Sequence, residues 1–442
     1  MTLAFNDFLH ELRFDDIPAE TLYFVKRCLL DLIGVAAAGS TTPLSNIIRQ
    51  HAVDHFGAGQ KSAQLLFDSR CTSPVGAALA NATTIDSMDA HDGLKPTKGH
   101  VGCGVLPALL ALTQAEKILD EREFLMQLLI GYELGSRAGV ALHQTACDYH
   151  TSGAWVTIAC AAMGARALGL NAQQTREAIG IAEYHGPRSQ MMRTIDAPTM
   201  VKDGSGWGAM AGVSAAYLAE SGYTGAPALT VEADDVADIW ADLGQRWYIK
   251  EQYFKPYPVC RWAQPPVVAT WALCNEHSLT VDMIESIEVI TFHEAKRLAT
   301  TLPETTEQAQ YSLPYAVAAA LVYGEIGPDQ VSQAALSNPE IHRLSSLMIL
   351  LEDDEYNAVF PERRIARVVV HTKRGKRYES APTEAKGDPE AHLSDDEIRE
   401  KFHRFADPVI GVSRSKNIEA VIDDLGNGNQ LNQLLDLITA KV

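Results

Sequence analysis

Residues 87–100 form a short segment crowded with ionisable side chains. It holds two acids, two histidines and two lysines: Asp89, Asp92, His91, His100, Lys95 and Lys98. Turn-forming residues interrupt it at Gly93, Pro96 and Gly99, and an apolar run follows at 105–112. Segments of this composition are typical of active-site loops between helices. The residue types predict proton-transfer chemistry.

Lys202 and two histidines supply groups that such chemistry needs. Abstraction of a proton from a carbon beside a carboxylate creates a dianion, so a base must act next to positive charge or strong hydrogen-bond donors. Lys202 can serve either purpose, as a base when desolvated beside another cation or as a charged partner of a carboxylate. His100 and His150 form the natural acid–base pair, because free imidazole titrates at about pH 6.5.

Several candidates also have a purely structural interpretation. We expect Asp89 to orient His100 or a backbone turn, because a carboxylate acting as the base would repel an anionic substrate. His91 fits a structural and a functional role equally well. Four cations can bind carboxylates, and solvated surface charge explains them almost as well: Arg188, Arg193, Lys95 and Lys98. Arg261 follows a proline-rich hinge and can place a cation under a lid.

The first two-thirds of the chain has helical periodicity. Residues 18–35 and 121–142 carry apolar stripes at helical spacing, and Pro18 suits a first helical turn. Residues 154–168 and 206–219 consist mainly of Ala, Gly and Ser. Small side chains let backbones approach closely, so we expect these two helices to be buried and packed against each other.

The pattern changes in the last third. Residues 284–292 alternate as a strand does, and residues 364–378 predict a hairpin that turns near 373–375. Helices are expected at 311–323 and 331–351. This mixture predicts an α+β domain.

The predicted fold is mostly α, with three parts. Residues 1–255 form a large all-helical domain, residues 256–392 a smaller α+β lid domain, and residues 393–442 helices that return to the first domain. Ser394 and Glu397 form a capping box at the start of this last part.

Composition indicates an ordinary soluble protein. The 442 residues are 46% hydrophobic and 21% charged, and the net charge of -19 argues against a nucleic-acid or anionic-membrane partner. No apolar run reaches the roughly 18 residues of a membrane span. Scattered cysteines and the absence of a leader segment predict a cytoplasmic protein.

The sequence lacks the common cofactor and metal motifs. Residues 99–104 have neither the spacing nor the preceding strand of a dinucleotide-binding turn. Residues 293–297 lack the second histidine of a zinc-protease helix, and no Gly-x-Ser-x-Gly elbow occurs. We therefore expect side-chain acid–base chemistry, without a metal or an organic cofactor.

Six segments occur in the order and spacing of a known family: residues 31–39, 87–100, 150–153, Lys202, 255–261 and 312–316. Together they resemble the MmgE/PrpD family, which includes 2-methylcitrate dehydratase, cis-aconitate decarboxylase and iminodisuccinate epimerase. The resemblance spans nearly the whole chain. It implies a helical domain, an α+β lid with the active site between them, and a homodimer without metal or organic cofactor.

The resemblance also assigns site residues. It implies that the acid of the site is Asp89 and that its histidines are His100 and His150. It also implies that the lysine is Lys202 and that the lid tyrosine is Tyr315. Tyr149 resembles a tyrosine that the epimerase branch pairs with the lysine.

Five positions depart from the pattern of the dehydratases and decarboxylases. Gly93 stands in place of a threonine, and His91 stands in place of an acid. Lys95, Ser205 and Gln264 each stand in place of a histidine. Most of these changes remove a titratable group. They favour epimerisation, because two opposed proton-transfer groups suffice for that reaction.

The sequence therefore predicts an isomerase or lyase that abstracts a proton next to a carboxylate of a small di- or tricarboxylic acid. The expected catalytic residues are Lys202, His150, Tyr149, His100 and Asp89. The expected substrate contacts are Lys95, Lys98, His91, Arg188, Arg193, Arg261, Gln264 and Tyr315. Dehydration of a methylcitrate-like acid and decarboxylation are alternatives, and so is a carboxylate-binding protein that has lost catalysis.

Overall fold

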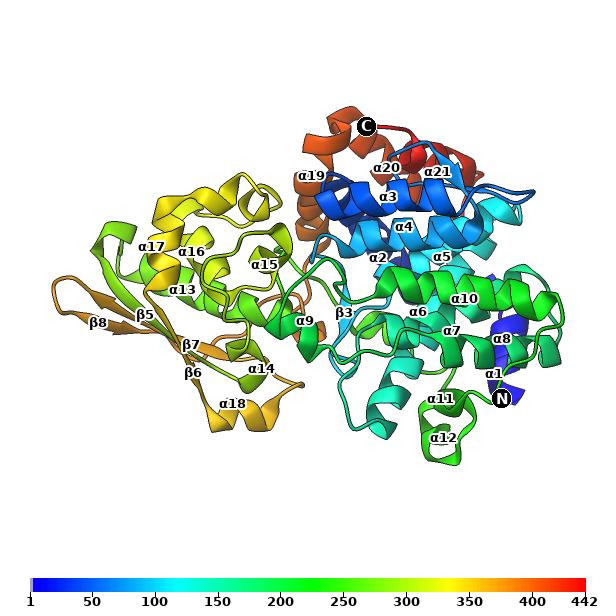
Figure 1. Cartoon of the computed structure of the whole chain (residues 1–442), viewed down its shortest axis with the longest axis horizontal. Coiled ribbons are helices and arrows are strands. Elements are labelled where there is room, and N and C mark those ends of the chain that lie inside the picture. The colour runs from blue at the N-terminus through cyan, green and yellow to red at the C-terminus, as the bar shows by residue number, and fades with distance from the viewer. Residues whose placement is uncertain (1–2) are drawn as a thin grey trace.

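The computed structural model describes residues 3–442, which form two lobes lying side by side (Figure 1). The larger lobe is almost entirely helical, and the smaller one combines a sheet with helices. The fold is mostly α with a smaller α+β part, and the predicted fold class is confirmed. Within the described residues, no helix combines the length and apolar character that a bilayer span requires.

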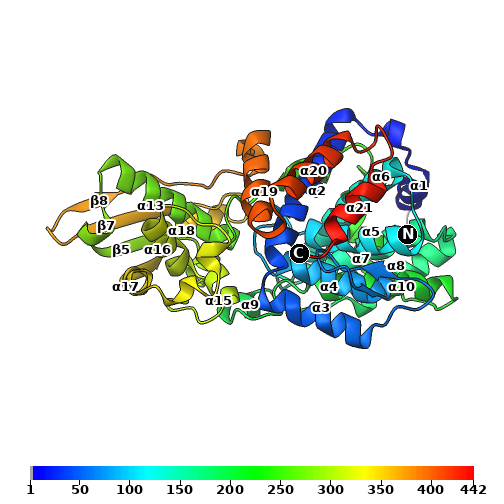
Figure 2. The same ribbon diagram turned by 90° about the horizontal axis from the view of Figure 1, so that it is seen from above.

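The larger lobe contains α1 (Leu3–Glu11), α2 (Ala19–Gly39), α3 (Pro43–His55), α4 (Pro74–Asp86), α5 (Gly102–Ala115), α6 (Glu121–Thr145), α7 (Gly153–Ala167), α8 (Ala172–His185), α9 (Met192–Asp196), α10 (Ser205–Glu220), α11 (Leu229–Glu232) and α12 (Ala237–Trp240). The chain ends with α19 (Asp395–Ile410), α20 (Val412–Asp424) and α21 (Leu431–Thr439). These last helices lie on the larger lobe, where α19 packs along α2 (Figure 2).

Helices α7 and α10 pack against each other inside the larger lobe. A Cβ at Gly208 would lie 2.5 Å from the carbonyl oxygen of Gly153, and a Cβ at Gly212 would lie 2.5 Å from that of Thr157. Only a residue without Cβ permits this approach. The predicted packing of the two small-residue helices is confirmed. It sets the N-termini of both helices side by side, where the Gly153 N–H donates to the carbonyl of Asp203 at 3.0 Å.

The smaller lobe is built on a four-stranded sheet in the order β6-β5-β7-β8. Its strands are β5 (Ile284–Thr291), β6 (Met348–Glu352), β7 (Ala366–Thr372) and β8 (Arg377–Glu379). Its helices are α13 (Gln264–Glu276), α14 (His293–Lys296), α15 (Thr306–Gln310), α16 (Leu313–Tyr323), α17 (Pro339–Ser346) and α18 (Asp354–Val359). Strand β5 pairs in parallel with β6 and antiparallel with β7. The predicted strand and hairpin are confirmed.

The helix expected at residues 331–351 is wrong. Only α17 is α-helical in this region, and it begins after Asn338, whose side chain caps it. The chain then enters β6, whose residues pair with β5 from Met348 to Glu352. Pairing with a buried strand outweighs the helical preference of this apolar run, because strand formation depends mainly on tertiary context.

Two short strand pairs complete the fold. Strand β1 (Ala63–Gln64) pairs with β2 (Cys71–Thr72) on the larger lobe. Strand β3 (Gly93–Leu94) pairs antiparallel with β4 (Gln252–Tyr253). Because β3 belongs to the ionisable loop and β4 leads into the smaller lobe, this second pair fixes the loop at the boundary between the lobes.

Candidate active site

A small cavity lies at the boundary between the two lobes. Its volume is about 20 Å³, which suits a water molecule and is too small for a tricarboxylate. Its polar lining comes from both lobes and the connection between them: Asp89, Lys98, His100, Tyr149, Tyr253, Lys255, Arg261 and Tyr311. The loop of residues 87–100 runs between α4 and α5 and supplies three of these side chains, as the sequence predicts.

A buried ion pair between Asp89 and Lys255 forms one wall of the cavity. Lys255 Nζ donates to Asp89 Oδ1 at 2.6 Å, and each side chain is at most 2% exposed. Burial alone would raise the pKa of Asp89, but the ammonium groups of Lys255 and Lys202 outweigh it and hold that pKa below its ordinary range. Burial alone would lower the pKa of Lys255, and Asp89 raises it above the ordinary value instead. Both partners are therefore ionised at neutral pH.

Lys202 reaches the same loop through Gln310 of the smaller lobe. Its Nζ donates to Gln310 Oε1 at 2.8 Å, and the same oxygen accepts the backbone N–H of Asp89 at 2.7 Å. The Lys202 ammonium also lies 4.6 Å from the ring centroid of Tyr311, which lines the cavity. Lys202 has φ of 48°, a conformation that few residues other than glycine adopt. The lysine is thus held rigidly behind the cavity wall.

His100 is positioned as a neutral imidazole. Its Nδ1 lies 2.5 Å from the carbonyl oxygen of Asp92 and its Nε2 lies 3.4 Å from Asp203 Oδ2. Because a carbonyl oxygen can only accept, Nδ1 carries the proton and Nε2 is the free acceptor. Burial and the charge of Lys255 lower the pKa of His100 well below its ordinary range. His100 is therefore unprotonated at neutral pH, and its Nε2 can accept a hydrogen bond.

Asp203 differs from Asp89 in its protonation. Burial, reinforced by the carboxylates of Asp86 and Asp89, raises the pKa of Asp203 well above its usual range. A protonated Asp203 can donate to His100 Nε2. Asp203 and Asp89 thus take opposite protonation states, as expected when their environments separate their pKa values.

His91, the other histidine of the loop, is fully buried behind His100. The two ring centroids lie 4.4 Å apart in an edge-on arrangement, and His91 Nε2 lies 3.5 Å from Asp86 Oδ1. Among the described residues, Asp89, His91 and His100 place one ligand atom each within 4.8 Å of one another, which is a possible metal-ligand set. The Lys255 ammonium already contacts Asp89, so a metal ion would have to displace it. The expectation that the protein uses no metal stays a prediction.

Besides Tyr253, two more tyrosines line the cavity. Tyr149 donates its hydroxyl to the carbonyl oxygen of Lys98, and the Lys98 ammonium lies 4.8 Å from the Tyr149 ring centroid. Tyr149 therefore contacts Lys98 rather than the predicted Lys202. Tyr311 lies between Lys202 and the cavity. Burial raises the pKa of both tyrosines well above the ordinary value, so both phenols are protonated.

The departures from the family pattern have structural explanations. A Cβ at Gly93 would lie 2.4 Å from Tyr253 Oη, so the tyrosine occupies the space of a larger side chain there. Gln264 accepts a hydrogen bond from Arg261 Nη1 at 2.9 Å and so orients a cation of the cavity. The hydroxyl of Ser205 lies 3.1 Å from Cys103 Sγ in the buried start of α10.

Eight of the thirteen predicted site residues lie outside the cavity lining. Lys202, His91 and Gln264 contact lining residues. The other five are His150, Arg188, Arg193, Tyr315 and Lys95. The imidazole of His150 contacts the carbonyl of Asp148 at 2.8 Å, whereas Arg188 and Arg193 are exposed. Tyr315 donates to the carbonyl of Gln330 at 2.8 Å inside the smaller lobe. Lys95 pairs with Glu390 at 2.7 Å. The catalytic and binding roles of these five residues stay predictions, and the lining of the cavity does not support them.

Four residues of the site were not predicted from the sequence: Lys255, Tyr253, Tyr311 and Asp203. Three of these had a signal in the sequence. Lys255 opens the motif at 255–261, Asp203 follows Lys202, and Tyr311 directly precedes the motif at 312–316. Tyr253 gave no such signal, because only its pairing opposite Gly93 brings it to the site.

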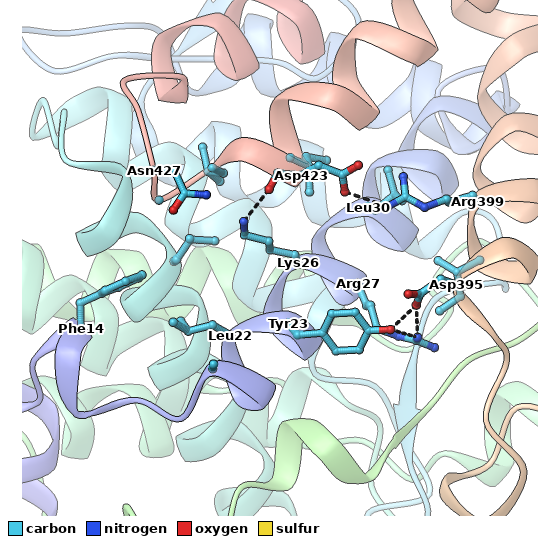
Figure 3. Close-up of a pocket in the computed structure, with 16 residues that line it drawn as sticks. Phe14, Leu22, Tyr23, Lys26, Arg27, Leu30, Asp395, Arg399, Asp423 and Asn427 are labelled. Atoms are coloured by element: carbon cyan, nitrogen blue, oxygen red, sulfur yellow. Dashed lines mark hydrogen bonds and ion pairs between the residues drawn. The ribbon is translucent and has the colours of Figure 1, made fainter.

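A larger cavity of about 460 Å³ lies among α2, α19 and α20 (Figure 3). Its charged side chains already have partners within the protein. Lys26 donates to the carbonyl of Asp423 at 2.8 Å, Arg399 pairs with the Asp423 side chain at 2.9 Å, and Arg27 pairs with Asp395. Since these groups already have partners, we place the chemistry in the smaller cavity.

Asp92 makes the site sensitive to pH, and Asp92→Asn should remove part of this sensitivity. Burial raises the pKa of Asp92 to about 7, whereas an unfolded aspartate titrates at about 3.9. Between these two pKa values the folded chain keeps a proton that the unfolded chain releases. The stability gained in this way is fully present below about pH 4 and is lost as the pH rises toward 7. We expect the Tm of Asp92→Asn, relative to wild type, to rise between about pH 4 and pH 8. A difference that stays constant with pH would contradict this assignment.

An ammonium–carboxylate pair, a neutral imidazole and three tyrosines converge in one small cavity between a helical lobe and an α+β lobe. Such an arrangement supports proton transfer and stabilises negative charge on a bound acid. Fold and site together define an enzyme of the isomerase or lyase class.

Comparison with known proteins gives the family. The MmgE/PrpD N-terminal domain matches residues 4–243, and the MmgE/PrpD C-terminal domain matches residues 257–427. The chain belongs to the MmgE/PrpD family, and the resemblance seen in the sequence is confirmed.

Relatives align over almost their whole lengths. The cis-aconitate decarboxylase-like protein oryM of Aspergillus oryzae is 26% identical over 489 residues, which cover 100% of this chain and 98% of the relative. The cis-aconitate decarboxylase of Homo sapiens is 24% identical, with 99% and 94% covered. That of Aspergillus terreus is 23% identical, with 97% and 94% covered.

Proposed function

We propose that the protein is a lyase that decarboxylates a small di- or tricarboxylic acid and protonates the carbon left behind. The observation that carries this proposal is the convergence of Lys255, Asp89, His100 and Tyr311 in one small cavity. The relatives named as cis-aconitate decarboxylases support it, because they align along the whole chain.

The reaction divides into two steps. Cleavage of the bond between carbon and carboxylate releases CO₂ and leaves the bonding electron pair on carbon. That pair delocalises into a neighbouring carboxylate, whose growing negative charge the ammonium groups of Lys255 and Lys202 stabilise. Lys255 is the closer of the two, because it lines the cavity.

Tyr311 is the proton donor in this proposal. Its phenol is protonated at neutral pH and faces the cavity beside Lys202. Protonation of the carbanion leaves a tyrosinate, which the nearby ammonium groups stabilise until solvent returns a proton. His100, neutral and close to Lys255, can relay that proton through Nε2.

Access requires the two lobes to separate. A cavity of about 20 Å³ cannot admit a tricarboxylate, and its lining comes from both lobes. Closure after binding would exclude water from the carbanion. The homodimer and the cytoplasmic location expected from the sequence stay predictions.

Epimerisation is the second candidate. It uses the same carbanion, and the departures at Gly93, Ser205 and Gln264 favour it because they remove side chains that the decarboxylases carry. It ranks second because Tyr149 hydrogen-bonds to Lys98 instead of meeting Lys202. Burial also raises the pKa of Tyr149, so its phenol stays protonated at neutral pH and cannot accept the proton in the reverse transfer.

A nuclear magnetic resonance assay in deuterated buffer separates these candidates. The purified protein is incubated with a panel of carboxyl-¹³C-labelled di- and tricarboxylates that includes cis-aconitate. A decarboxylase releases labelled CO₂ and bicarbonate and places one deuteron in the product. An epimerase places deuterium in the remaining acid without releasing CO₂. Binding without either change would refute both reactions and favour a binding protein.

A further inference from the structure

Arg364 carries a buried positive charge that the described part of the chain leaves without hydrogen bonds. It lies just before β7, is 2% exposed, and none of its Nε, Nη1 and Nη2 atoms has a hydrogen-bond partner among residues 3–442. Buried guanidinium groups are rare unless paired, because each N–H that loses water without gaining an acceptor destabilises the folded state. The arrangement indicates an acceptor that comes from outside the chain.

Asp388 forms an ion pair with Arg364 but no hydrogen bond. Arg364 Nη1 lies 3.7 Å from Asp388 Oδ1, beyond hydrogen-bond length. The same carboxylate pairs with Arg261 at 2.9 Å and with Lys95 at 3.4 Å. Lys95 has a second partner in Glu390 at 2.7 Å. Three cations therefore face two anions, which leaves one positive charge in excess.

Arg364 lies one aromatic ring away from the candidate active site. Its guanidinium carbon is 4.8 Å from the ring centroid of Tyr253, and that of Arg261 is 5.4 Å from the same centroid. Tyr253 and Arg261 both line the cavity. Burial lowers the pKa of Lys98, another lining residue, and the positive charge of Arg364 adds to this effect. Positive charge thus gathers at one end of the cavity.

We propose that Arg364 binds a carboxylate of the substrate that does not react, and that it sets the preference for acids with at least two carboxylates. This inference rests on the proposed function, since it concerns the same site. A guanidinium presents paired N–H groups that match a carboxylate in a bidentate fork, which an ammonium cannot reproduce. When the lobes open and close around the substrate, its remote carboxylate accepts hydrogen bonds from the Arg364 guanidinium beside Tyr253.

The test uses binding and turnover in parallel. Arg364→Met removes the charge with little change in volume, and Arg364→Gln is the milder variant if the first does not fold. Arg363→Met is the matched control, because Arg363 is exposed and pairs with Glu384. The binding probe is propane-1,2,3-tricarboxylate, followed by the rise in Tm and by calorimetry. The acid found in the turnover assay supplies KM and kcat.

We expect Arg364→Met to weaken binding of the probe and to raise KM by about 10- to 100-fold, the range of a lost charge-assisted hydrogen bond. The kcat should change much less, and Arg363→Met should behave as wild type. Equal binding by Arg364→Met and wild type would overturn the proposal while leaving the lyase intact. If wild type binds the probe, Arg364→Met does not, and no acid is turned over, the lyase is refuted and the binding site stands. If wild type does not bind the probe at all, the Arg364 site is refuted.

Discussion

Replacement of Lys255 with methionine is expected to reduce kcat/KM by about 10³-fold or more, because it removes the cation that stabilises the growing negative charge. It is also expected to lower the free energy of unfolding by about 3–5 kcal/mol, because Asp89 is left as an unpaired buried charge. The pair has an Nζ–Oδ1 distance of 2.6 Å and almost no solvent exposure, so water cannot replace the lost partner. Steady-state kinetics and urea unfolding measure the two effects.

A double variant separates catalysis from stability. In Asp89→Asn combined with Lys255→Met the buried charge disappears with its partner, so most of the lost stability should return. Activity should stay as low as in the single Lys255 variant. If the double variant regained activity together with stability, Lys255 would be a structural residue, and the charge-stabilising role assigned to it would be wrong.

The second large effect concerns Tyr311. Tyr311→Phe keeps the ring beside the Lys202 ammonium and removes only the hydroxyl. If this phenol protonates the carbanion, kcat should fall by about 10²- to 10⁴-fold, the range for loss of a general acid. The Tm should change little, and labelled CO₂ release should slow together with deuterium incorporation.

Tyr315→Phe is the matched control for Tyr311→Phe. Its hydroxyl donates to the carbonyl of Gln330, away from the cavity, so we expect a small loss of stability and a kcat close to that of wild type. The opposite ranking, with Tyr315→Phe inactive and Tyr311→Phe active, would assign the proton to the tyrosine that the family resemblance implies.

Local sequence patterns predicted much of the fold. The Ala, Gly and Ser composition of α7 and α10 implied their close contact, and the alternation at 284–292 implied β5. The capping box of Ser394 and Glu397 is present at the start of α19. The error at 331–351 arose where a short apolar run pairs with β5, because no local pattern reveals a partner more than 50 residues away in sequence.

The candidate site was predictable only in part, for the same reason. The loop of residues 87–100 could be identified because its ionisable residues lie together. The contact between Lys202 and Gln310 joins residues 108 positions apart, and that between Asp89 and Lys255 joins residues 166 apart. Burial also decides protonation: Asp89 and Asp203 are the same residue type, and only their neighbours make one ionised and the other neutral.

The most direct test of a catalytic cavity between the lobes is a crystal structure of the protein with propane-1,2,3-tricarboxylate. We predict that the acid lies between the lobes, with one carboxylate at Lys255 and its central carbon beside Tyr311. An acid bound only in the cavity among α2, α19 and α20, with Lys255 and Tyr311 untouched, would contradict the account.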